Sequence, residues 1–390
     1  MSDQKNEPSR RDIAGMALAG AAALAATAPA ANAKPMIPIP PGLKIGVSAN
    51  RLSPEYTNYL KQLGVQWLSL APIQAEATAE GFIKQKAAWE AEGFQVYNIG
   101  SGVGPSGSLH NMSEVTLNLP GRDQKIEEYL NYIRYLGKAK VPYSTYAHMG
   151  NGIWSSGRVI SARGYSARDG NANSPEWKGV WAGKTFTGPL SHGRVYTEQE
   201  IWDNYIYFIK KVKPVAEEAG VRIGIHPDDP PMRMLAGVPR CIFSNFEGYK
   251  KAIEIADSPN IGVCFCIGSW LEGGEKNTGA DPVEVIKYFA AKKKLFKVHF
   301  RNVTAPLPHF VEALIDDGYY DMSKAMQALV DVKFDGIVIP DHIPAVGTNP
   351  NQPDTSRGAA QGEYRPHPGL AYLLGSMNAM HKSAQRNARA

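Results

Sequence analysis

The sequence contains very little cysteine: Cys241, Cys264 and Cys266 are the only three in 390 residues. An odd, sparse set of cysteines is a poor framework for disulfides, even in an oxidising compartment. Cys264 and Cys266 are two residues apart in a strand-like run, so their side chains point to the same side and cannot easily bridge. The number and spacing of these cysteines exclude a scaffold held together by disulfides. The composition, 43% hydrophobic and 20% charged, is instead typical of a globular protein with a large core.

The sequence also lacks a strong charge of one sign and a long apolar run. The formal net charge is +5, and no run of Lys and Arg with interleaved aromatic residues forms a stripe. We therefore expect no nucleic-acid partner. The apolar stretch over residues 13–26 is too short, and too rich in Ala and Gly, to span a membrane, which takes about 20 residues. We expect no stable membrane anchor.

The first 33 residues predict an export signal. Arg10 and Arg11 precede the apolar stretch, and Ala31-Asn32-Ala33 places small residues at the positions that a signal peptidase reads before Lys34. This order predicts a twin-arginine signal, residues 1–33, with cleavage after Ala33. The alternative is an N-terminal helix that belongs to the folded protein. We expect the twin-arginine export machinery as a partner, and the mature protein in a periplasm or outside the cell.

Eight short β-rich runs recur along the rest of the chain, each followed by a helical pattern. The runs begin near Leu43, Val65, Phe94, Val141, Val221, Ile261, Leu295 and Gly336. The helical patterns cover Pro54–Leu63, Thr78–Glu92, Arg122–Lys140, Glu198–Ala219, Asn245–Ala256, Asp281–Lys293, Asp321–Val330 and Gly369–Ala384. Alternating strands and helices of this kind predict an α/β fold, a (β/α)₈ TIM barrel. No linker divides the chain, so we expect one domain over residues 34–390.

Five long connections follow strands, which places them on the C-terminal rim where barrel enzymes build their sites. The connection Met149–Leu190 is rich in Gly, Ser and Trp and lacks a helical period, which makes it the best candidate for a lid. Its Trp154, Trp177 and Trp181 could cover a sugar face, and Arg158 is a further candidate for binding substrate. The alternative is a surface elaboration or a subunit contact. The five connections are 101–120, 149–190, 267–280, 302–318 and 343–368.

Four chelating side chains stand at the ends of the last four strand-like runs: His226, Cys266, His299 and Asp341. Parallel strands that end on one rim would bring them together. Two imidazoles, one thiolate and one carboxylate suit a divalent transition ion such as Mn, Fe, Co or Zn. Each residue alone has a structural explanation, as a hydrogen-bonded rim histidine, a small buried group or a helix cap. Their shared position at four consecutive strand ends favours a metal site.

Several neighbours of these residues could act on a substrate. Arg301, two residues after His299, could clamp a carboxylate or form a salt bridge to Asp228 or Asp341. His342, Asp228 and His309 are the candidates for proton transfer. His309 lies in a rim loop and is equally well explained as a surface histidine. Asp229 could orient a ligand histidine or simply belong to an acidic turn.

These motifs resemble those of mannonate dehydratase, a metal-dependent TIM barrel of the xylose-isomerase-like kind. The resemblance spans roughly 43–380 and implies His226, Cys266, His299 and Asp341 as ligands of Mn²⁺ or Fe²⁺, with Arg301 contacting substrate. The chain departs from the family pattern at Tyr319-Tyr320, Ile343-Pro344 and Leu370. The motifs that carry the resemblance are His226-Pro-Asp-Asp-Pro-Pro231, Gly237-Val-Pro-Arg240, Phe265-Cys-Ile-Gly-Ser269, Val298-His-Phe-Arg301, Pro340-Asp-His342 and Leu119-Pro-Gly-Arg-Asp123 with Ile126, Glu127 and Tyr129.

The resemblance implies elimination of water from a sugar acid, a D-mannonate-like aldonate, to give a 2-keto-3-deoxy acid. Two alternatives stay open at this stage. One is a metal-dependent sugar isomerase or epimerase on the same barrel, against which the thiolate of Cys266 argues mildly. The other is a non-catalytic periplasmic protein that binds sugar acids. Association into a homo-oligomer is also open.

Overall fold

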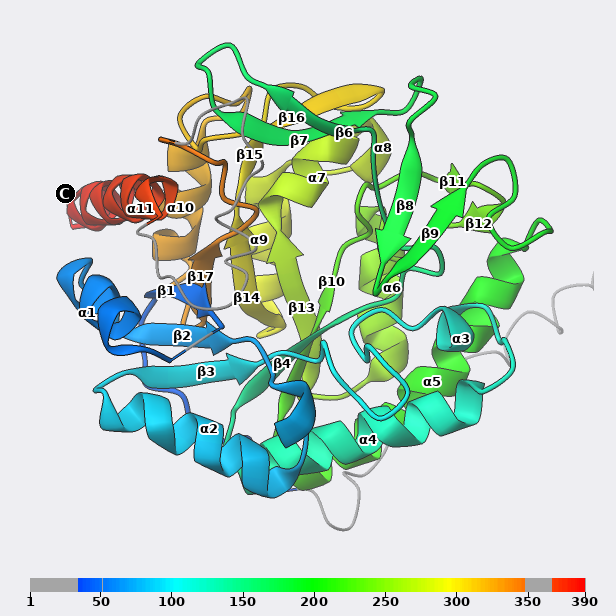
Figure 1. The fold of residues 1–390 in the computed structure, drawn as a ribbon, viewed down its shortest axis with the longest axis horizontal. Coiled ribbons are helices and arrows are strands. Elements are labelled where there is room, and N and C mark those ends of the chain that lie inside the picture. Colours follow the sequence, from blue (N-terminus) through cyan, green and yellow to red (C-terminus); the bar gives the residue numbers. More distant parts are fainter. Residues whose placement is uncertain (1–33, 51, 348–366, 390) are drawn as a thin grey trace, which may run out of the picture.

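The structure is a computed structural model that describes residues 34–50, 52–347 and 367–389. Eight parallel strands close into a barrel in the order β1-β17-β14-β13-β10-β4-β3-β2, which confirms the predicted TIM barrel (Figure 1). The predicted signal peptide lies outside the described residues, and so does most of the last rim loop. The barrel strands are β1 (Lys44–Ala49), β2 (Trp67–Leu70), β3 (Gln95–Ile99), β4 (Tyr143–Ala147), β10 (Arg222–His226), β13 (Ile261–Cys266), β14 (Leu295–Phe300) and β17 (Ile337–Pro340).

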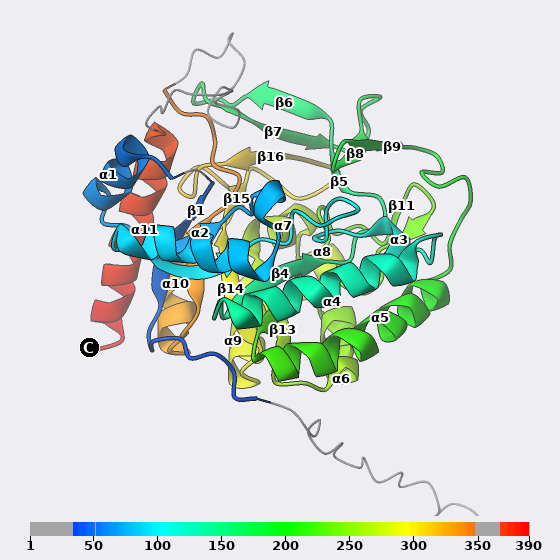
Figure 2. The same cartoon turned by 60° about the horizontal axis from the view of Figure 1, so that its bottom comes forward.

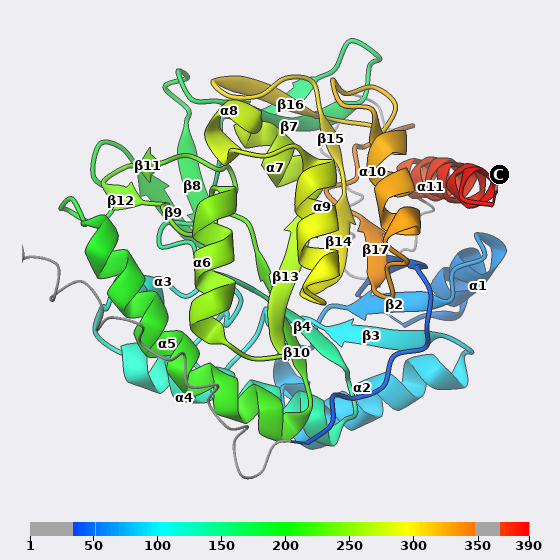
Figure 3. The ribbon, with the colours of Figure 1, turned by 180° about the vertical axis from the view of Figure 1, so that it is seen from behind.

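Most of the helices that pack around the barrel begin where the sequence provides capping side chains. Ser53, Thr78, Thr197, Asn245 and Asp281 each accept a hydrogen bond from a backbone N–H in the first turn of the helix that follows. The helices are α1 (Pro54–Gln62), α2 (Ala79–Ala91), α4 (Arg122–Lys138), α5 (Glu198–Ala219), α6 (Phe246–Ala256), α9 (Pro282–Ala291), α10 (Met322–Asp331) and α11 (Pro368–Asn387). Figure 3 shows α5, α6, α9 and α10 side by side on the outside of the barrel. No helix among the described residues is long and apolar enough to cross a membrane.

The connection predicted as a long loop after β4 is a β-rich insertion, which corrects that expectation. We call residues 149–190 the insertion. It supplies β5 (Ile153–Ser155), β6 (Gly157–Ile160), β7 (Ser166–Asn171), β8 (Lys178–Trp181) and β9 (Lys184–Thr187). These form one sheet in the order β5-β8-β9 and extend a second, β15 (Asn302–Val303)-β16 (His309–Ala313)-β7-β6. Figure 2 shows this β-structure above the barrel, on the side away from the chain's entry at Lys34.

The strands of the insertion could not be predicted from the sequence because they are short and rich in Gly, Ser and charged residues. All four residues of β6 are exposed, so no alternation of apolar and polar residues marks that strand. The segment 267–280 was likewise expected to be a loop. It instead contains the short helices α7 (Ile267–Gly273), which begins directly at the end of β13, and α8 (Glu275–Thr278). Smaller elements elsewhere are η1 (Gln74–Glu76), α3 (Ser113–Thr116), β11 (Met234–Leu235) and β12 (Val238–Pro239).

The inside of the barrel is filled by large side chains and by glycines that make room for them. A buried cluster includes Tyr97, Tyr143, Phe296 and Ile337, and Gly224 on β10 lies directly against Tyr143. The register pairs His226 with Ala147 and Cys266 with His299. The filled interior therefore supports a row of strand ends at one level, and the predicted ligands lie in that row.

We expect a Gly224→Ala substitution to lower the free energy of unfolding by about 1–3 kcal/mol, because the added Cβ would overlap the hydroxyl and ring of Tyr143. Gly375, in the middle of the exposed face of α11, is the matched control: a Cβ there meets nothing within 4 Å. Gly375→Ala should raise the free energy of unfolding by up to about 1 kcal/mol. Urea denaturation measures both, and equal effects would contradict this account of the interior.

Candidate metal centre and active site

Three of the four predicted ligands meet at the C-terminal rim. His226 ends β10, Cys266 ends β13 and His299 lies near the end of β14. One ligand atom from each lies within 4.8 Å of the other two. The parallel strands thus bring together residues that are far apart in the sequence.

Both histidines are neutral, and each has a ring nitrogen that could bind a metal ion. Nδ1 of His226 donates to the carbonyl oxygen of Pro227 at 2.7 Å, which leaves Nε2 with its lone pair. Burial lowers the pKa of His226 and holds the pKa of His299 well below its usual range. Nε2 of His299 lies 3.6 Å from Sγ of Cys264, while its Nδ1 is buried and lacks a hydrogen-bond partner among the described residues. An orphaned nitrogen at this place fits a metal ligand.

Asp341, the fourth predicted ligand, follows β17 and adjoins this cluster. Its Oδ2 lies 3.7 Å from Sγ of Cys266 and 3.6 Å from Nδ1 of His299. Burial opposes ionisation of Asp341, but His342, His299 and Arg301 outweigh it and hold its pKa well below the usual range. Burial raises the pKa of Cys266, and the nearby Arg301 opposes that shift. Two imidazoles, a sulfur and a carboxylate at one point fit a divalent transition ion.

A buried ionic network lies directly behind the cluster. Arg301 is 1% exposed, and its Nη1 lies 2.5 Å from Oε1 of Glu272 and 3.0 Å from Oε1 of Glu312. Its Nε lies 3.4 Å from Oδ2 of Asp341, and its Nη2 lies 3.6 Å from Sγ of Cys266. The alternative of a salt bridge between Arg301 and Asp341 is therefore present, and its predicted contact with substrate stays a prediction.

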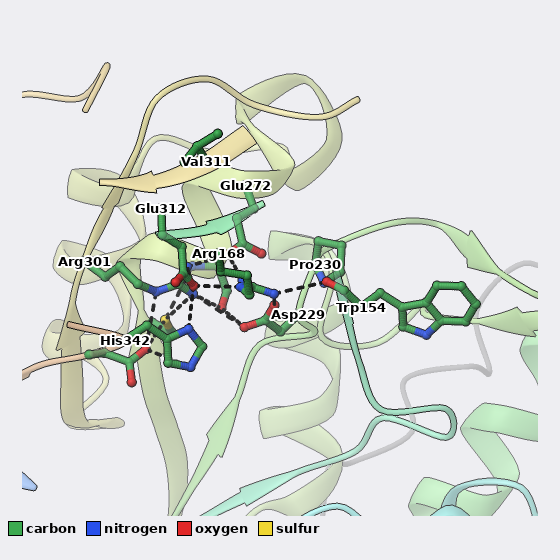
Figure 4. Close-up of polar contacts among 12 residues, drawn as sticks. Trp154, Arg168, Asp229, Pro230, Glu272, Arg301, Val311, Glu312 and His342 are labelled. Carbon is green, nitrogen blue, oxygen red and sulfur yellow. Dashed lines mark hydrogen bonds and ion pairs between the residues drawn. The ribbon is translucent and has the colours of Figure 1, made fainter. Parts of the chain in front are cut away.

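The insertion adds a second arginine to this network. Arg168 on β7 lies 2.9 Å from Oδ1 of Asp229 and 2.8 Å from Oε1 of Glu312, and it also pairs with Glu272. Figure 4 shows both guanidinium groups pointing toward these carboxylates. Asp229 thus belongs to an ionic network, and a role in orienting a ligand histidine stays a prediction.

His342 connects the ionic network to the candidate metal ligand Asp341. Its Nδ1 donates to Oε1 of Glu312 at 2.6 Å, and its Nε2 lies 3.9 Å from Oδ2 of Asp341 (Figure 4). Burial lowers the pKa of His342, but the carboxylates of Asp341 and Glu312 outweigh it and the net shift is upward. The backbone of His342 has a positive φ of 45°, an unfavourable conformation of a kind that concentrates at functional sites.

We expect Arg168→Met to lower the free energy of unfolding by about 3–5 kcal/mol, because it leaves buried carboxylates without one of their two cations. The control is Arg163→Met on the same insertion, where a 42% exposed side chain pairs with Asp316. That change should stay within about 0.5 kcal/mol. Denaturant unfolding measures both, and an unchanged R168M would show that the network does not stabilise the insertion.

Asp228 and His309, the other two candidates for proton transfer, do not belong to the cluster of predicted ligands. Asp228 is buried, its N–H donates to the carbonyl of Phe243, and burial raises its pKa to about 7. His309 lies half-exposed on β16, with Nε2 2.7 Å from Oδ1 of Asp169 in the insertion. Neither has a hydrogen bond or ion pair to the four predicted ligands among the described residues, and their proton-transfer roles stay predictions.

The predicted substrate-binding residues of the insertion occupy different surroundings. Trp154 is 1% exposed and packs with Phe186 and Leu235, and with Trp177 it lines a cavity of about 580 Å³. Its Nε1 donates to the carbonyl oxygen of Asn151 at 2.9 Å. Arg158 lies on the exposed β6 and donates to the hydroxyl and the carbonyl of Ser166. The structure brings neither side chain into the metal cluster.

Sequence analysis missed Arg168, Glu272 and Glu312. A signal existed for Glu312, because it interrupts the apolar run Phe310-Val-Glu-Ala-Leu-Ile315, and a weaker one for Glu272, which directly follows Trp270-Leu271. Arg168 gave none, since it sits among small and polar residues in a segment expected to be a loop. The chain departs from the family pattern at Tyr319 and Tyr320. Both form hydrogen bonds at the C-terminal rim, where the hydroxyl of Tyr319 donates to the carbonyl of Leu271 and that of Tyr320 donates to Asp281.

The comparison with protein families decides the class of this chain. Residues 185–387, just over half of the chain, match the family model described as D-mannonate dehydratase (UxuA). The chain belongs to the D-mannonate dehydratase family. It is therefore an enzyme of the hydro-lyase class, as the motifs around His226 and Asp341 predicted.

Relatives with this description share moderate identity with the chain. A mannonate dehydratase of Streptococcus equi subsp. zooepidemicus is 29% identical over 293 residues, which cover 70% of this chain and 76% of the relative. One from Oceanobacillus iheyensis is 32% identical over 257 residues, covering 60% of this chain and 70% of the relative. The matching family model spans β10, β13, β14 and β17, which carry or lead to all four candidate ligands.

Solved structures agree on the fold. The mannonate dehydratase from Streptococcus suis serotype 2 superposes with a TM-score of 0.70 at 24% identity, covering 89% of this chain and 95% of that one. A D-psicose 3-epimerase with D-tagatose, from Clostridium cellulolyticum H10, gives a TM-score of 0.52 at 14% identity, covering 87% and 99%. These likenesses establish the xylose-isomerase-like TIM barrel and not the reaction.

Proposed function

We propose that this enzyme removes water from a D-mannonate-like aldonate to give a 2-keto-3-deoxy acid, and that it depends on Mn²⁺ or Fe²⁺. The observation that carries the proposal is the cluster of His226, Cys266 and His299 beside Asp341, within a chain of this family. The isomerase or epimerase alternative has only a likeness of fold in its favour, at 14% identity to the epimerase named above.

The chemistry requires that a weakly acidic C2 proton leave an aldonate and that the C3 hydroxyl depart as water. A divalent ion held by His226, Cys266, His299 and Asp341 would supply positive charge to stabilise the negative charge that develops next to the carboxylate. The protein must supply the proton transfers. A C2 proton goes to a base, and an acid donates a proton to the departing hydroxyl.

His342 is the residue best suited to the acid step. Glu312 fixes its ring through Nδ1, which leaves Nε2 for exchange with the substrate. Its raised pKa favours the protonated form that an acid needs. Arg301 acts from behind, where it helps to keep Asp341 ionised and lies within reach of the Cys266 sulfur. The base stays unassigned between His342 in its neutral form, Asp228 and His309.

The test is to incubate the protein, loaded anaerobically with Mn²⁺ or Fe²⁺, with a panel of aldonates that includes D-mannonate. Mass spectrometry should detect a product lighter by one water and bearing a 2-keto group. An isomer of unchanged mass would favour the isomerase or epimerase. Substrate that binds without turnover would favour a sugar-acid binding protein.

We also propose that the chain is exported through the twin-arginine route and works in a periplasm or outside the cell. The paired Arg10 and Arg11, the apolar stretch after them and Ala31-Asn32-Ala33 support this proposal. Replacing Arg10 and Arg11 together with Lys should retain the protein in the cytoplasm, because the paired arginines are the recognised feature. N-terminal sequencing of exported wild-type protein should begin at Lys34, and an uncleaved cytoplasmic protein would contradict the proposal.

A further inference from the structure

A further histidine, His110, lies on the C-terminal rim next to the strand that pairs with the His226 strand. His110 lies in the rim segment after β3, and its carbonyl oxygen accepts a hydrogen bond from the N–H of Ala147 at 2.9 Å. The next residue, Asn111, forms a parallel bridge with the same Ala147. Ala147 is the direct partner of His226 in the pairing of β4 with β10. The backbone of His110 is therefore held one strand away from a candidate metal ligand.

The ring of His110 is fixed in one tautomer. Its Nδ1 lies 3.3 Å from the carbonyl oxygen of Thr145 and 3.2 Å from Oγ of Ser101. The hydroxyl of Ser101 itself donates to that carbonyl at 2.9 Å, so both neighbours of Nδ1 can only accept its proton. Burial, and next the imidazole of His226, lower the pKa of His110 to about 3. The ring is therefore neutral, and Nε2 carries a lone pair.

The side chain of Trp181 lies against this ring. The two ring centroids are 5.3 Å apart, with the planes tilted by 34°. Trp181 ends β8 at a tight turn through Ala182 and Gly183, both at positive φ. Figure 1 shows that β8, a strand of the insertion, points toward the rim of the barrel. Nζ of Lys184, which follows that turn, lies 3.1 Å from Oε1 of Glu114 on α3.

Trp181 also brings an unused hydrogen-bond donor. Its Nε1 is buried and has no hydrogen-bond partner among the described residues. An indole N–H can only donate, and a buried donor without a partner costs about 1–3 kcal/mol. Aromatic packing alone would account for the ring contact with His110, but it leaves the buried indole N–H of Trp181 without a partner among the described residues.

We propose that His110 and Trp181 form a hydroxyl-binding pair that holds the polyhydroxylated tail of the sugar-acid substrate. Nε2 of His110 accepts a hydrogen bond from the substrate, and the indole N–H of Trp181 donates one. A sugar hydroxyl both donates and accepts, so one hydroxyl or two adjacent ones can use both groups. The inference rests on the proposed dehydration of an aldonate, and it identifies two residues that bind the part of the substrate away from the reacting carbons.

The strand order of the barrel places His110 and Trp181 at one end of the candidate active site. In the order β17-β14-β13-β10-β4-β3, the ionic network and His342 lie at the β14 and β17 end of the candidate site, and His110 lies at the β4 end. Asp341 and His226 both influence the pKa of His110, which puts it within electrostatic reach of the metal cluster. A linear aldonate whose carboxylate end lies near Arg301 and His342 would extend its remaining hydroxyls toward His110 and Trp181.

Two conservative variants remove one partner each. Trp181→Phe keeps an aromatic ring against His110 and deletes the N–H. His110→Asn keeps an amide N–H able to reach the carbonyl of Thr145 and deletes the acceptor at Nε2. Each should lower kcat/KM for the aldonate about tenfold, mainly through KM, because the hydrogen bond is made to a group that does not react. Trp202→Phe, at a tryptophan on the outer helix α5 whose ring lies against Tyr205, is the matched control and should leave kcat/KM unchanged.

The decisive experiment uses aldonates that lack one tail hydroxyl each. With the wild-type enzyme, one deoxy-aldonate should lose about the same factor as Trp181→Phe causes, and the variant should show no additional loss with that analogue. Equal penalties on every analogue, or no effect of either variant, would overturn the inference. Calorimetric binding of the same compounds gives a second readout. If no aldonate binds to or reacts with the wild-type enzyme, the proposed function fails and this inference fails with it.

Discussion

His342→Asn should lower kcat for aldonate dehydration by about 10²–10⁴-fold while leaving metal binding intact. The expected loss is the usual contribution of a positioned acid or base, because the substitution removes the only ring nitrogen that Glu312 leaves for exchange. Asparagine is the appropriate replacement, since it tolerates the positive φ of 45° that His342 adopts. Steady-state kinetics and metal analysis on the same preparation measure the two effects.

The control is His381→Asn on α11, a half-buried histidine in the last helix. It should change neither kcat nor metal content. A His342→Asn enzyme that turned over at the wild-type rate would exclude His342 from proton transfer and shift attention to Asp228. A variant that lost its metal as well as its activity would assign His342 to binding the ion.

Cys266→Ala and His226→Ala should each abolish turnover and weaken binding of Mn²⁺ by more than the roughly 10–100-fold that loss of an outer-shell partner causes. Each deletes one of the three donors that lie within 4.8 Å of one another. Bound metal also stabilises the folded state, by about 2.7 kcal/mol when its concentration is a hundred times the Kd. Both variants should lose that metal-dependent rise in unfolding temperature.

Cys241→Ser serves as the matched thiol control, because Cys241 is partly exposed and its Sγ lies 3.9 Å from the carbonyl of Glu198, outside the cluster. It should bind Mn²⁺ and respond to it as the wild type does. Retention of full metal affinity by Cys266→Ala would contradict the ligand role of the thiolate. Isothermal titration with the metal, together with thermal unfolding, distinguishes these results.

The barrel and the cluster of candidate metal ligands were predictable because both follow from local sequence. The barrel strands are short β-rich runs followed by helices, most of them capped by a side chain, and His226, Cys266 and His299 stand at or next to the ends of such runs. Because parallel strands end on one rim, the positions of the strand ends in the sequence were enough to predict that these candidate ligands lie close together. The predicted helix over Glu198–Ala219 has the bounds found in the structure, since Thr197 and Glu200 form a capping box and Gly220 ends it.

The ionic network and the His110–Trp181 contact could not be predicted, because they depend on tertiary pairing. Arg168 reaches Glu312 only because β7 pairs with β16 across 140 or so residues of chain. Trp181 reaches His110 only because the β8–β9 hairpin turns toward the rim. No local pattern records which strands of an insertion pair with one another, and the exposed β6 shows how little alternation such strands carry.

We propose that loss of water from a sugar acid requires a metal ion held at His226, Cys266, His299 and Asp341. The most direct test titrates metal-free protein with Mn²⁺ under anaerobic conditions and follows bound metal and release of 2-keto acid from D-mannonate in the same samples. We predict that the rate rises in proportion to bound metal and levels off at one ion per chain, and that His299→Ala shows neither binding nor turnover. Undiminished turnover in the metal-free protein would contradict the account.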